Sequence, residues 1–423
     1  MAGGELGAVF RVREFRVVWA AELLSIAGDQ LARVALAVLV YGRTGSAAWA
    51  AATYALTFLP ALLGGVLLSG LADRYRRREV MIGSDVLRAV LVAAMAIPHL
   101  PLWALCALLV VVVLLGSPHT AAQGALLPEI LRGELYERGL AVRQITSQTA
   151  QLVGFASGGV LVAAISPSLA LLANAVSFAL SAVLVRTGVA DRPQPGTTDG
   201  DDEAGGSAAD APVGGLRGVV AALVEIATDP RRRALVLLAW LVGWYVVPEA
   251  LAAPYADQLG AGPAVVGLLM AADPLGSVVG AWLFVRFVPA ETRARLVGVL
   301  AVGAGLPLIL CLFRPPLPLT LLLWGVSGML STAYLLQTQA SFVRATPTVG
   351  RGRAIGVAAS GIIAAQGAAV LIGGFLADTW DPSTAIAVAG SVGAVLALGV
   401  AVAWHRANRP DTETVGSTVL SRG

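Results

Sequence analysis

Residues 69–78 read Ser-Gly-Leu-Ala-Asp-Arg-Tyr-Arg-Arg-Arg and connect two apolar blocks, residues 48–69 and 80–98. A cluster of arginines directly between two apolar blocks is typical of a loop at the cytoplasmic face of a membrane. The same alternation of apolar blocks and arginine-rich connections runs through the rest of the chain. The pattern predicts a protein that crosses a membrane many times.

Twelve apolar blocks are long enough to cross a bilayer, which takes about 20 residues of α-helix. The chain has 423 residues, of which 57% are hydrophobic and 13% are charged, whereas a soluble domain carries about 25% charged residues. We therefore expect an all-α membrane protein with twelve transmembrane helices. The blocks are residues 15–41, 48–69, 80–98, 102–122, 140–165, 168–185, 234–253, 264–287, 296–313, 317–340, 354–376 and 384–404.

The arginines are distributed unevenly between the two sides of these blocks. All 29 basic residues are arginines, because the chain contains no lysine. With both termini in the cytoplasm, Arg43 and Arg314 fall outside, Arg33 and Arg88 fall within helices, and all other arginines fall on the cytoplasmic side. This bias predicts a multi-pass membrane protein, and the absence of lysine with abundant Ala, Gly and Arg suggests the cell membrane of a bacterium. The net charge of +3 then reflects contact with anionic lipid headgroups of the bilayer, not with nucleic acid.

A polar segment divides the chain into two halves. Residues 188–215 contain six acidic residues and no Phe, Trp or Tyr, so they predict a disordered linker. Residues 216–228 have apolar side chains at helical spacing and predict a short amphipathic helix on the membrane surface. The expected domains are a six-helix bundle, a cytoplasmic linker, a second six-helix bundle and a cytoplasmic tail: residues 1–187, 188–233, 234–404 and 405–423.

The two halves match one another at a constant offset of 215 residues. Two parallel six-helix repeats with a site between them are a known plan of secondary transporters. We therefore expect two pseudo-symmetric bundles around a central cavity. The matching positions are Arg138 and Arg353, Gln151 and Gln366, Gly158 and Gly373, Gly159 and Gly374, Pro167 and Pro382, and Ser168 and Ser383.

Charged residues within the apolar blocks are the first candidates for function, because a charge at the bilayer centre costs about 2.5–3.5 kcal/mol. Glu22, Asp29 and Arg33 are spaced so that all three face one side of the first helix. Glu22 or Asp29 could gain and lose a proton; alternatively, Asp29 and Arg33 could form a permanent i, i+4 pair. Asp273 and Glu249 are candidates for binding a proton or cation in the second half.

Aromatic and amide side chains could form a wall for a substrate, although Trp and Tyr also serve as anchors at the membrane interface. Cys106 and Cys311 lie in apolar blocks and His99, His119 and His405 lie near block ends, so we expect no metal, cofactor or enzymatic site. The substrate-cavity candidates are Tyr54, Phe58, Trp240, Trp244, Tyr334 and Gln337.

The loop at residues 69–78 resembles the signature loop of the major facilitator superfamily, Gly-x-Leu-Ala-Asp-Arg-x-Gly-Arg-Arg. The loop differs at two positions, where Ser69 replaces the first glycine and Arg76 replaces the second. The resemblance implies that Asp73 closes the cytoplasmic side against the start of the eleventh span near Arg353. A charge network beside the loop would involve Asp85. The residues assigned to this gate are Asp73, Arg74, Arg77, Arg78, Asp85, Arg88 and Arg353.

Residues 154–159 read Gly-Phe-Ala-Ser-Gly-Gly and are similar to the Gly-Pro-x-x-Gly-Gly motif of proton-coupled exporters, with Phe155 in place of the proline. The glycines could equally serve only to let helices pack closely. The pivot glycines would be Gly154, Gly158, Gly159, Gly373 and Gly374.

Residues 83–88, 125–129, 174–178 and 351–353 resemble the bacterial efflux branch that contains macrolide exporters and enterobactin-type siderophore exporters. The arginine that many drug–proton antiporters carry in the fourth helix is absent, because residues 102–122 contain none.

The resemblance implies a secondary active transporter, a monomer that exports a small hydrophobic or amphiphilic compound by alternating access and is driven by protons. The compound could be a drug, macrolide-like or siderophore-like. We expect more acids than arginines in the cavity, which favours cationic or neutral substrates. A lipid flippase and an uptake permease are alternatives on the same scaffold, and a non-transporting receptor is an alternative of a different class.

Overall fold

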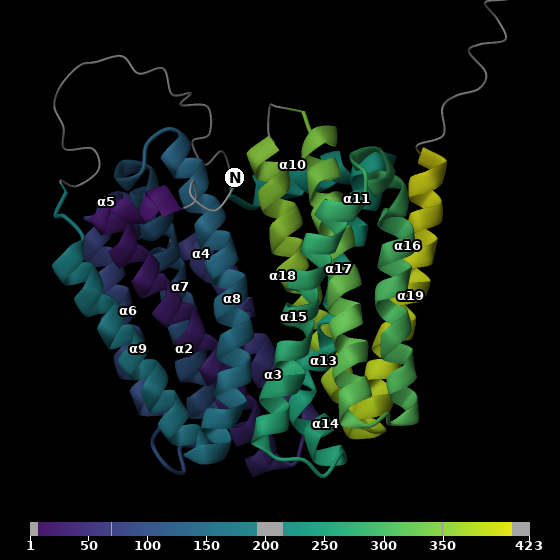
Figure 1. Ribbon diagram of the computed structural model, residues 1–423, viewed down its shortest axis with the longest axis horizontal. Coiled ribbons are helices and arrows are strands. Elements are labelled where there is room, and N and C mark those ends of the chain that lie inside the picture. The colour runs from purple at the N-terminus through teal and green to yellow at the C-terminus, as the bar shows by residue number, and fades with distance from the viewer. Residues whose placement is uncertain (1–6, 69, 193–214, 348–350, 408–423) are drawn as a thin grey trace, which may run out of the picture.

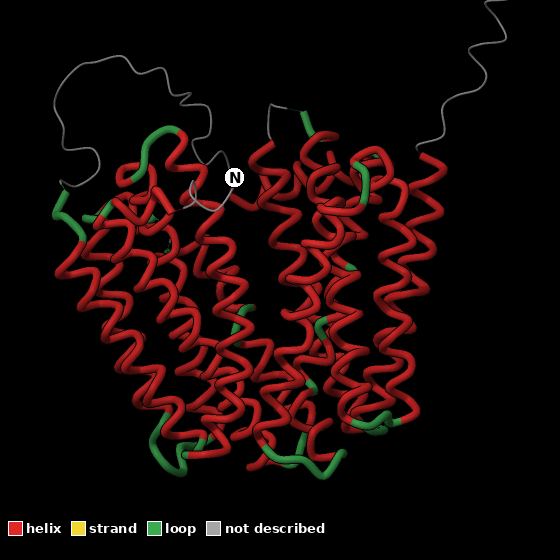
Figure 2. The backbone as a smooth tube through the Cα atoms, viewed as in Figure 1, coloured by secondary structure: helices red, strands yellow, loops and turns green. Residues whose placement is uncertain are grey.

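The computed structural model describes residues 7–68, 70–192, 215–347 and 351–407. Within these ranges every regular element is a helix and no strand occurs, as Figure 2 shows. The prediction of an all-α protein is confirmed. Residues 193–214 of the predicted linker and residues 408–423 of the predicted tail lie outside the described residues.

The helices that precede the polar segment form one bundle, which we call the first half. In it α2 packs along α8 and α9, and α6 packs along α7 and α9 (Figure 1). Its helices are η1 (Gly7–Arg11), α2 (Arg13–Thr44), α3 (Ala47–Leu56), α4 (Leu59–Leu67), α5 (Leu71–Arg74), α6 (Arg77–Met95), α7 (Leu102–Ile130), α8 (Glu134–Ala164) and α9 (Pro167–Gly188).

The helices that come after the polar segment form a second bundle, the second half, in which α15 and α16 pack along α17, and α16 also packs along α19. It begins with α10 at the position of the predicted amphipathic helix. Its helices are α10 (Gly215–Thr228), α11 (Pro230–Trp240), α12 (Val242–Tyr245), α13 (Val247–Ala250), α14 (Ala252–Gln258), α15 (Pro263–Phe287), α16 (Ala290–Ile309), η2 (Leu310–Phe313), α17 (Leu317–Ala345), α18 (Arg351–Thr379) and α19 (Pro382–Ala407).

Ten segments in the described part of the chain are long and apolar enough to cross a membrane. The two predicted spans outside this set are α6 and α8, which are 19 and 31 residues long. Both carry more charged or polar side chains than the other spans, but both run alongside the apolar helices of their bundle (Figure 1). We count them as the remaining two of the twelve crossings.

Two predicted spans are interrupted where the sequence suggested continuous helices. The second span breaks at Thr57 and Phe58, directly before Pro60, and the seventh is divided into α11, α12, α13 and α14 around Pro248. Proline lacks the backbone N–H and clashes with the preceding turn, which explains both breaks. The interruptions bring the side chains of Phe58 and Glu249 to the middle of the molecule.

The two halves meet along α8 with α15 and along α3 with α18. A Cβ atom on Gly159 would lie 2.6 Å from Cα of Gly267, and one on Gly374 would lie 3.1 Å from Cα of Ala48. Only glycine permits such close approach of backbones. Because Gly159 and Gly374 are matched at the 215-residue offset, the repeat in the sequence corresponds to a symmetric seam between the halves.

Hydrogen bonds between the halves gather at one end of the molecule, which we call the far end. Asp378 of α18 accepts hydrogen bonds from the Ala47 backbone N at 2.5 Å and from Ser46 Oγ at 2.6 Å, at the start of α3. Tyr41 donates to Asp257 at 3.0 Å. Toward the opposite end, where arginines begin α6, α11 and α18, the two bundles diverge (Figure 1). We call this the arginine-rich end.

We expect Gly159→Ala to destabilise the seam. An alanine inside a helix normally stabilises it by about 0.5–1 kcal/mol relative to glycine, but here the new methyl group overlaps the backbone at Gly267, and overpacking costs about 1–3 kcal/mol. Gly399→Ala is the matched control, because a Cβ at Gly399 in α19 has no atom within 4 Å. Thermal unfolding in detergent should show a lower Tm for Gly159→Ala only; equal shifts would contradict this account.

Candidate functional site

A cavity of about 680 Å³ lies within the first half. Its lining residues all fall between positions 22 and 174, and they come from α2, the turn between α3 and α4, and α4, α6, α7, α8 and α9. Glu22, Asp29 and Arg33 line it together, as their spacing on α2 predicts. Apolar side chains, including Phe58 and Met95, form much of the remaining wall. We call this the first cavity.

A smaller cavity of about 290 Å³, the second cavity, lies between the halves. Tyr54 from the first half and Glu249 and Asp273 from the second half line it. Arg33 and Phe58 line both cavities, so the two spaces adjoin.

Glu22 and Asp29 are each paired with an arginine from another helix. Arg143 of α8 donates from Nε and Nη2 to the carboxylate of Glu22 at 2.7 and 2.8 Å. Arg88 of α6 donates from Nη2 to both oxygens of Asp29, at 3.0 and 3.3 Å. The alternative i, i+4 pair between Asp29 and Arg33 is therefore not formed, because Arg88 reaches Asp29 from the opposite wall of the cavity.

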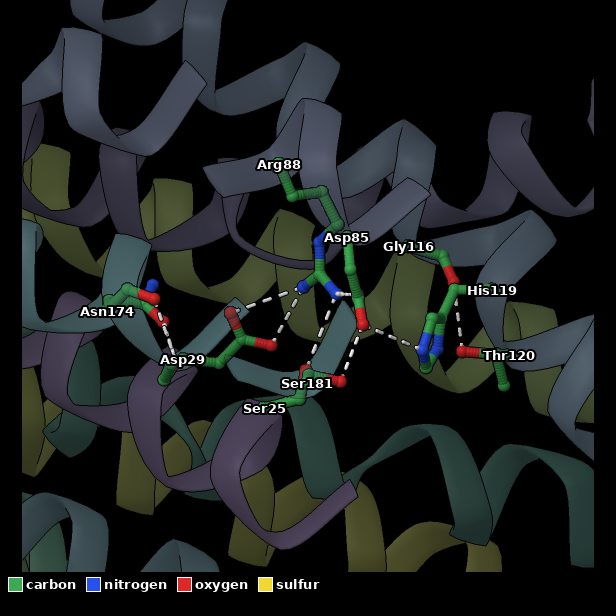
Figure 3. A network of polar contacts seen from close by, with 10 residues as sticks. Ser25, Asp29, Asp85, Arg88, Gly116, His119, Thr120, Asn174 and Ser181 are labelled. Carbon is green, nitrogen blue, oxygen red and sulfur yellow. Dashed lines mark hydrogen bonds and ion pairs between the residues drawn. The ribbon is translucent and has the colours of Figure 1, made fainter. Parts of the chain in front are cut away.

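Asp85 and Arg88 belong to this buried network and not to the loop beside them, as Figure 3 shows. Asp85 is fully buried and accepts a hydrogen bond from Ser181 at 2.6 Å. Arg88 Nη1 lies 3.7 Å from Asp85, in addition to the contact of Nη2 with Asp29. Asp85 and Arg88 thus take part in a charge network, because α6 directs both side chains inward, toward α2 and α9; a role of either residue in the gate stays a prediction.

The second cavity brings two carboxylates and a tyrosine together across the boundary between the halves. Tyr54 of α3 donates a hydrogen bond to Glu249 of α13. Asp273 of α15 accepts a hydrogen bond from Ser277 at 3.4 Å. Among the residues that the structure describes, neither Glu249 nor Asp273 forms an ion pair, and the arginine lining the same cavity is Arg33.

The described partners of the loop arginines Arg77 and Arg78 belong to the first half. Arg77 bonds to Glu129 and to the carbonyl of Ala125, and Arg78 bonds to the carbonyl of Arg186. Arg74 lies in α5, and Arg353 is exposed near the start of α18. The side chain of Asp73 lies outside the described part of the chain, so its contact near Arg353 stays a prediction.

Only part of the predicted substrate wall lies at these cavities. Tyr54 and Phe58 do, whereas the other four candidates make their contacts within the second half. Trp240 donates to the carbonyl of Ala358, Gln337 donates to Ser341, Tyr334 packs edge-on against Tyr245, and Trp244 packs against the apolar core.

The expected excess of acids over arginines is wrong for the first cavity. Two acids, Glu22 and Asp29, share it with Arg33, Arg88 and Arg143. The excess holds only in the second cavity, where Glu249 and Asp273 face Arg33. Arg143 was missed because its position near the start of the fifth span suggested the membrane surface.

Comparisons with known proteins agree with this architecture. The sequence profile of the Major Facilitator Superfamily matches residues 18–248 and 235–420. The multidrug efflux pump Tap of Mycobacterium tuberculosis is 24% identical over 375 residues, which cover 85% of each protein. Macrolide efflux protein A of Streptococcus pyogenes is 27% identical over 125 residues, and the uncharacterized MFS-type transporter YvqJ of Bacillus subtilis is 28% identical over 178 residues.

These last two matches cover 29% and 41% of this chain, and the chain spans only 31% and 42% of the two relatives. Among solved structures, a bacterial homologue of the human lysosomal transporter Spinster has a TM-score of 0.66 at 15% identity, covering 93% of this chain and 95% of that one. A POT family transporter in complex with 5-aminolevulinic acid has a TM-score of 0.71 at 12% identity, covering 94% and 97%. The chain therefore belongs to the Major Facilitator Superfamily, whose members are membrane transporters and not enzymes.

Proposed function

We propose that this protein exports small hydrophobic or amphiphilic compounds across the cell membrane in exchange for protons, by alternating access. The observation that carries the proposal is the pair of adjoining cavities, one with a large apolar wall and one with two half-buried carboxylates between the halves. The names of two relatives, a multidrug efflux pump and a macrolide efflux protein, support export as the direction.

The arginine-rich end is the cytoplasmic end in this proposal, because arginines accumulate on the inner side of membrane proteins. The hydrogen bonds of Asp378 and the close approach at Gly159 then lie toward the outside. With this orientation the protein would be in an inward-facing state, in which a compound would enter from the cytoplasm or the inner leaflet.

Proton coupling is assigned to Asp273 and Glu249 in preference to Glu22 and Asp29. Glu22 and Asp29 already have guanidinium counter-charges within hydrogen-bond distance. In the part of the chain that the structure describes, Asp273 and Glu249 have none bound, and leaving a charge without a partner inside a bilayer is costly. A proton is the counter-charge that this pair lacks.

The contact between Tyr54 and Glu249 links protonation to the movement of the halves. It joins α3 of the first half to α13 of the second, close to the seam. When the halves separate on the outer side, Glu249 loses this donor. Its preference for a proton then changes with conformation, which is what coupled transport needs.

We expect Asp273→Asn and Glu249→Gln to reduce proton-driven export at least tenfold. Each change fixes one group in an uncharged form, so the gradient no longer drives the cycle. Efflux of the fluorescent cation ethidium from inverted vesicles, with and without a pH gradient, measures the effect. Glu134→Gln is the matched control, because the Glu134 side chain is 85% exposed.

Full gradient-dependent export by both variants would contradict the coupling assignment. Gradient-driven transport in the opposite direction would indicate an uptake permease. Movement of fluorescent phospholipids between leaflets without ethidium efflux would indicate a lipid flippase.

We expect Asp378→Ala to shift the protein away from the inward-facing state. The change removes two hydrogen bonds across the halves, and a loss of about 1–2 kcal/mol changes the ratio of the two states by roughly fivefold to thirtyfold. Spin labels at Trp103→Cys and Phe313→Cys, which replace exposed side chains on different halves, report the separation at the far end after Cys106 and Cys311 are replaced by alanine.

Asp381→Ala is the control for this experiment, because Asp381 bonds to Thr384, Ser383 and Gln258 within the second half. Longer distances should become more populated with Asp378→Ala alone. An unchanged distance distribution would show that Asp378 does not stabilise this state.

A further inference from the structure

The glutamines that the repeat matches in the two halves both line the second cavity. Gln151 of α8 and Gln366 of α18 occupy equivalent positions, 215 residues apart. Their helices are also those that carry the seam glycines Gly159 and Gly374. Gln148, one turn before Gln151 on α8, lines the same cavity. The boundary between the halves therefore presents three amide side chains to one space.

These three amides have no partner among the protein groups that the structure describes. Gln148, Gln151 and Gln366 are each half-buried, and none of their side chains forms a hydrogen bond within the described ranges. The hydroxyls of the same cavity differ, since Thr332 donates to Ser277 at 2.7 Å. Polar groups inside a protein are rarely left without a partner. An amide both donates and accepts hydrogen bonds, so a ligand that completes all three must do the same.

The charged groups of the second cavity favour an uncharged ligand. Arg33, Glu249 and Asp273 line it. When one of the two acids carries the proton of the proposed function, Arg33 balances the other acid. A charged ligand would then lack a counter-charge in a poorly solvated site, which is costly. A group with several hydroxyls avoids this cost, because a hydroxyl can donate to a carboxylate and accept from a guanidinium group.

Phe58 provides an aromatic surface where the two cavities join. It lines both of them, and its ring lies edge-on to Tyr54 with the ring centroids 5.7 Å apart. The face of an aromatic ring is electron-rich and attracts C–H groups, which one face of a sugar ring presents. Phe58 therefore suits the point at which a sugar is joined to an apolar group.

The sizes of the two cavities fit a ligand with a small polar part and a larger apolar part. The second cavity, at about 290 Å³, is close to the lower limit of ligand pockets, about 300 Å³. It has room for one sugar ring but not for a whole amphiphile. The first cavity has about 680 Å³, and Leu36, Val92 and Met95 contribute to its apolar wall.

We propose that the second cavity binds the sugar of an uncharged amphiphilic glycoside, whose apolar part lies in the first cavity. Gln151 and Gln366 hydrogen-bond to the sugar hydroxyls from opposite halves, with Gln148 beside Gln151. The inference rests on the proposed function and names its substrate class. It makes the glutamines the residues that distinguish a glycoside from an amphiphile without a sugar.

Titration calorimetry with the purified full-length protein in lipid nanodiscs tests the proposal. The probes are 2-naphthyl β-glucoside and 2-naphthyl β-galactoside, compared with 2-methoxynaphthalene, which has the same aromatic group and no sugar. Nanodiscs without protein correct for partition into the lipid. We expect one or both glycosides to bind about tenfold tighter or more, because a compound without hydroxyls leaves the amides unpaired.

Gln151→Leu and Gln366→Leu should each weaken glycoside binding by about fivefold or more and leave the binding of 2-methoxynaphthalene unchanged. Leucine is similar in size to glutamine, so the change removes mainly the hydrogen-bonding group. Gln144→Leu is the matched control, because Gln144 is an exposed glutamine of α8 that lines neither cavity. If a variant does not fold, the comparison of probes on the unaltered protein still decides.

Equal binding of the glycosides and 2-methoxynaphthalene would overturn the proposal, and so would unchanged glycoside binding in either glutamine variant. Tighter binding of 2-naphthoate than of both glycosides would also overturn it, because the cavity would then suit an anion. Binding needs no gradient, so its outcome is separate from that of the vesicle experiment. If a glycoside binds through the glutamines but no gradient drives export, the proposed function fails and this inference stands. If export is gradient-driven but binding does not depend on the glutamines, the inference alone fails.

Discussion

The need to balance every charge inside a lipid bilayer governs this structure. Arg88 meets that need for Asp29 and Asp85 together, with Nη2 3.0 Å from one carboxylate and Nη1 3.7 Å from the other. The three side chains come from α2 and α6, so the pairing also holds these helices in register. Removing one partner of a buried ion pair typically costs about 3–5 kcal/mol. The first half thus depends on Arg88 both for its packing and for the charge of its cavity.

The repeat and the membrane pattern could be predicted from the sequence, because both are properties of single helices. The 215-residue offset identified Gly159 and Gly374, and the structure places both at contacts between the halves. The interruption at Thr57 and Phe58 was not predicted, although Pro60 was a visible signal. Hydropathy indicates whether a segment is apolar enough to lie in the bilayer. It does not indicate whether the helix is continuous or interrupted, because one proline leaves the segment apolar in both cases.

The candidate site was only partly accessible to sequence reasoning, because its pairings are tertiary. Helical spacing placed Glu22, Asp29 and Arg33 on one face of α2, and all three do line the first cavity. Their partners lie far along the chain: Arg88 is 59 residues from Asp29, and Arg143 is 121 residues from Glu22. No periodicity within one helix indicates which helix will pack opposite. His119 had no sequence signal at all, since its neighbour Asp85 belongs to another helix.

The difference in charge between the two cavities explains why Arg33 lies where they join. The second cavity is acidic, with Glu249 and Asp273, whereas the arginines of the first cavity outnumber its acids. Arg33 borders both, so a change of charge on either side alters the field at its guanidinium group. In the proposed function, a proton taken up by Glu249 or Asp273 would weaken the attraction of Arg33 to the second cavity. Arg33 is thus the charged side chain that the two cavities share.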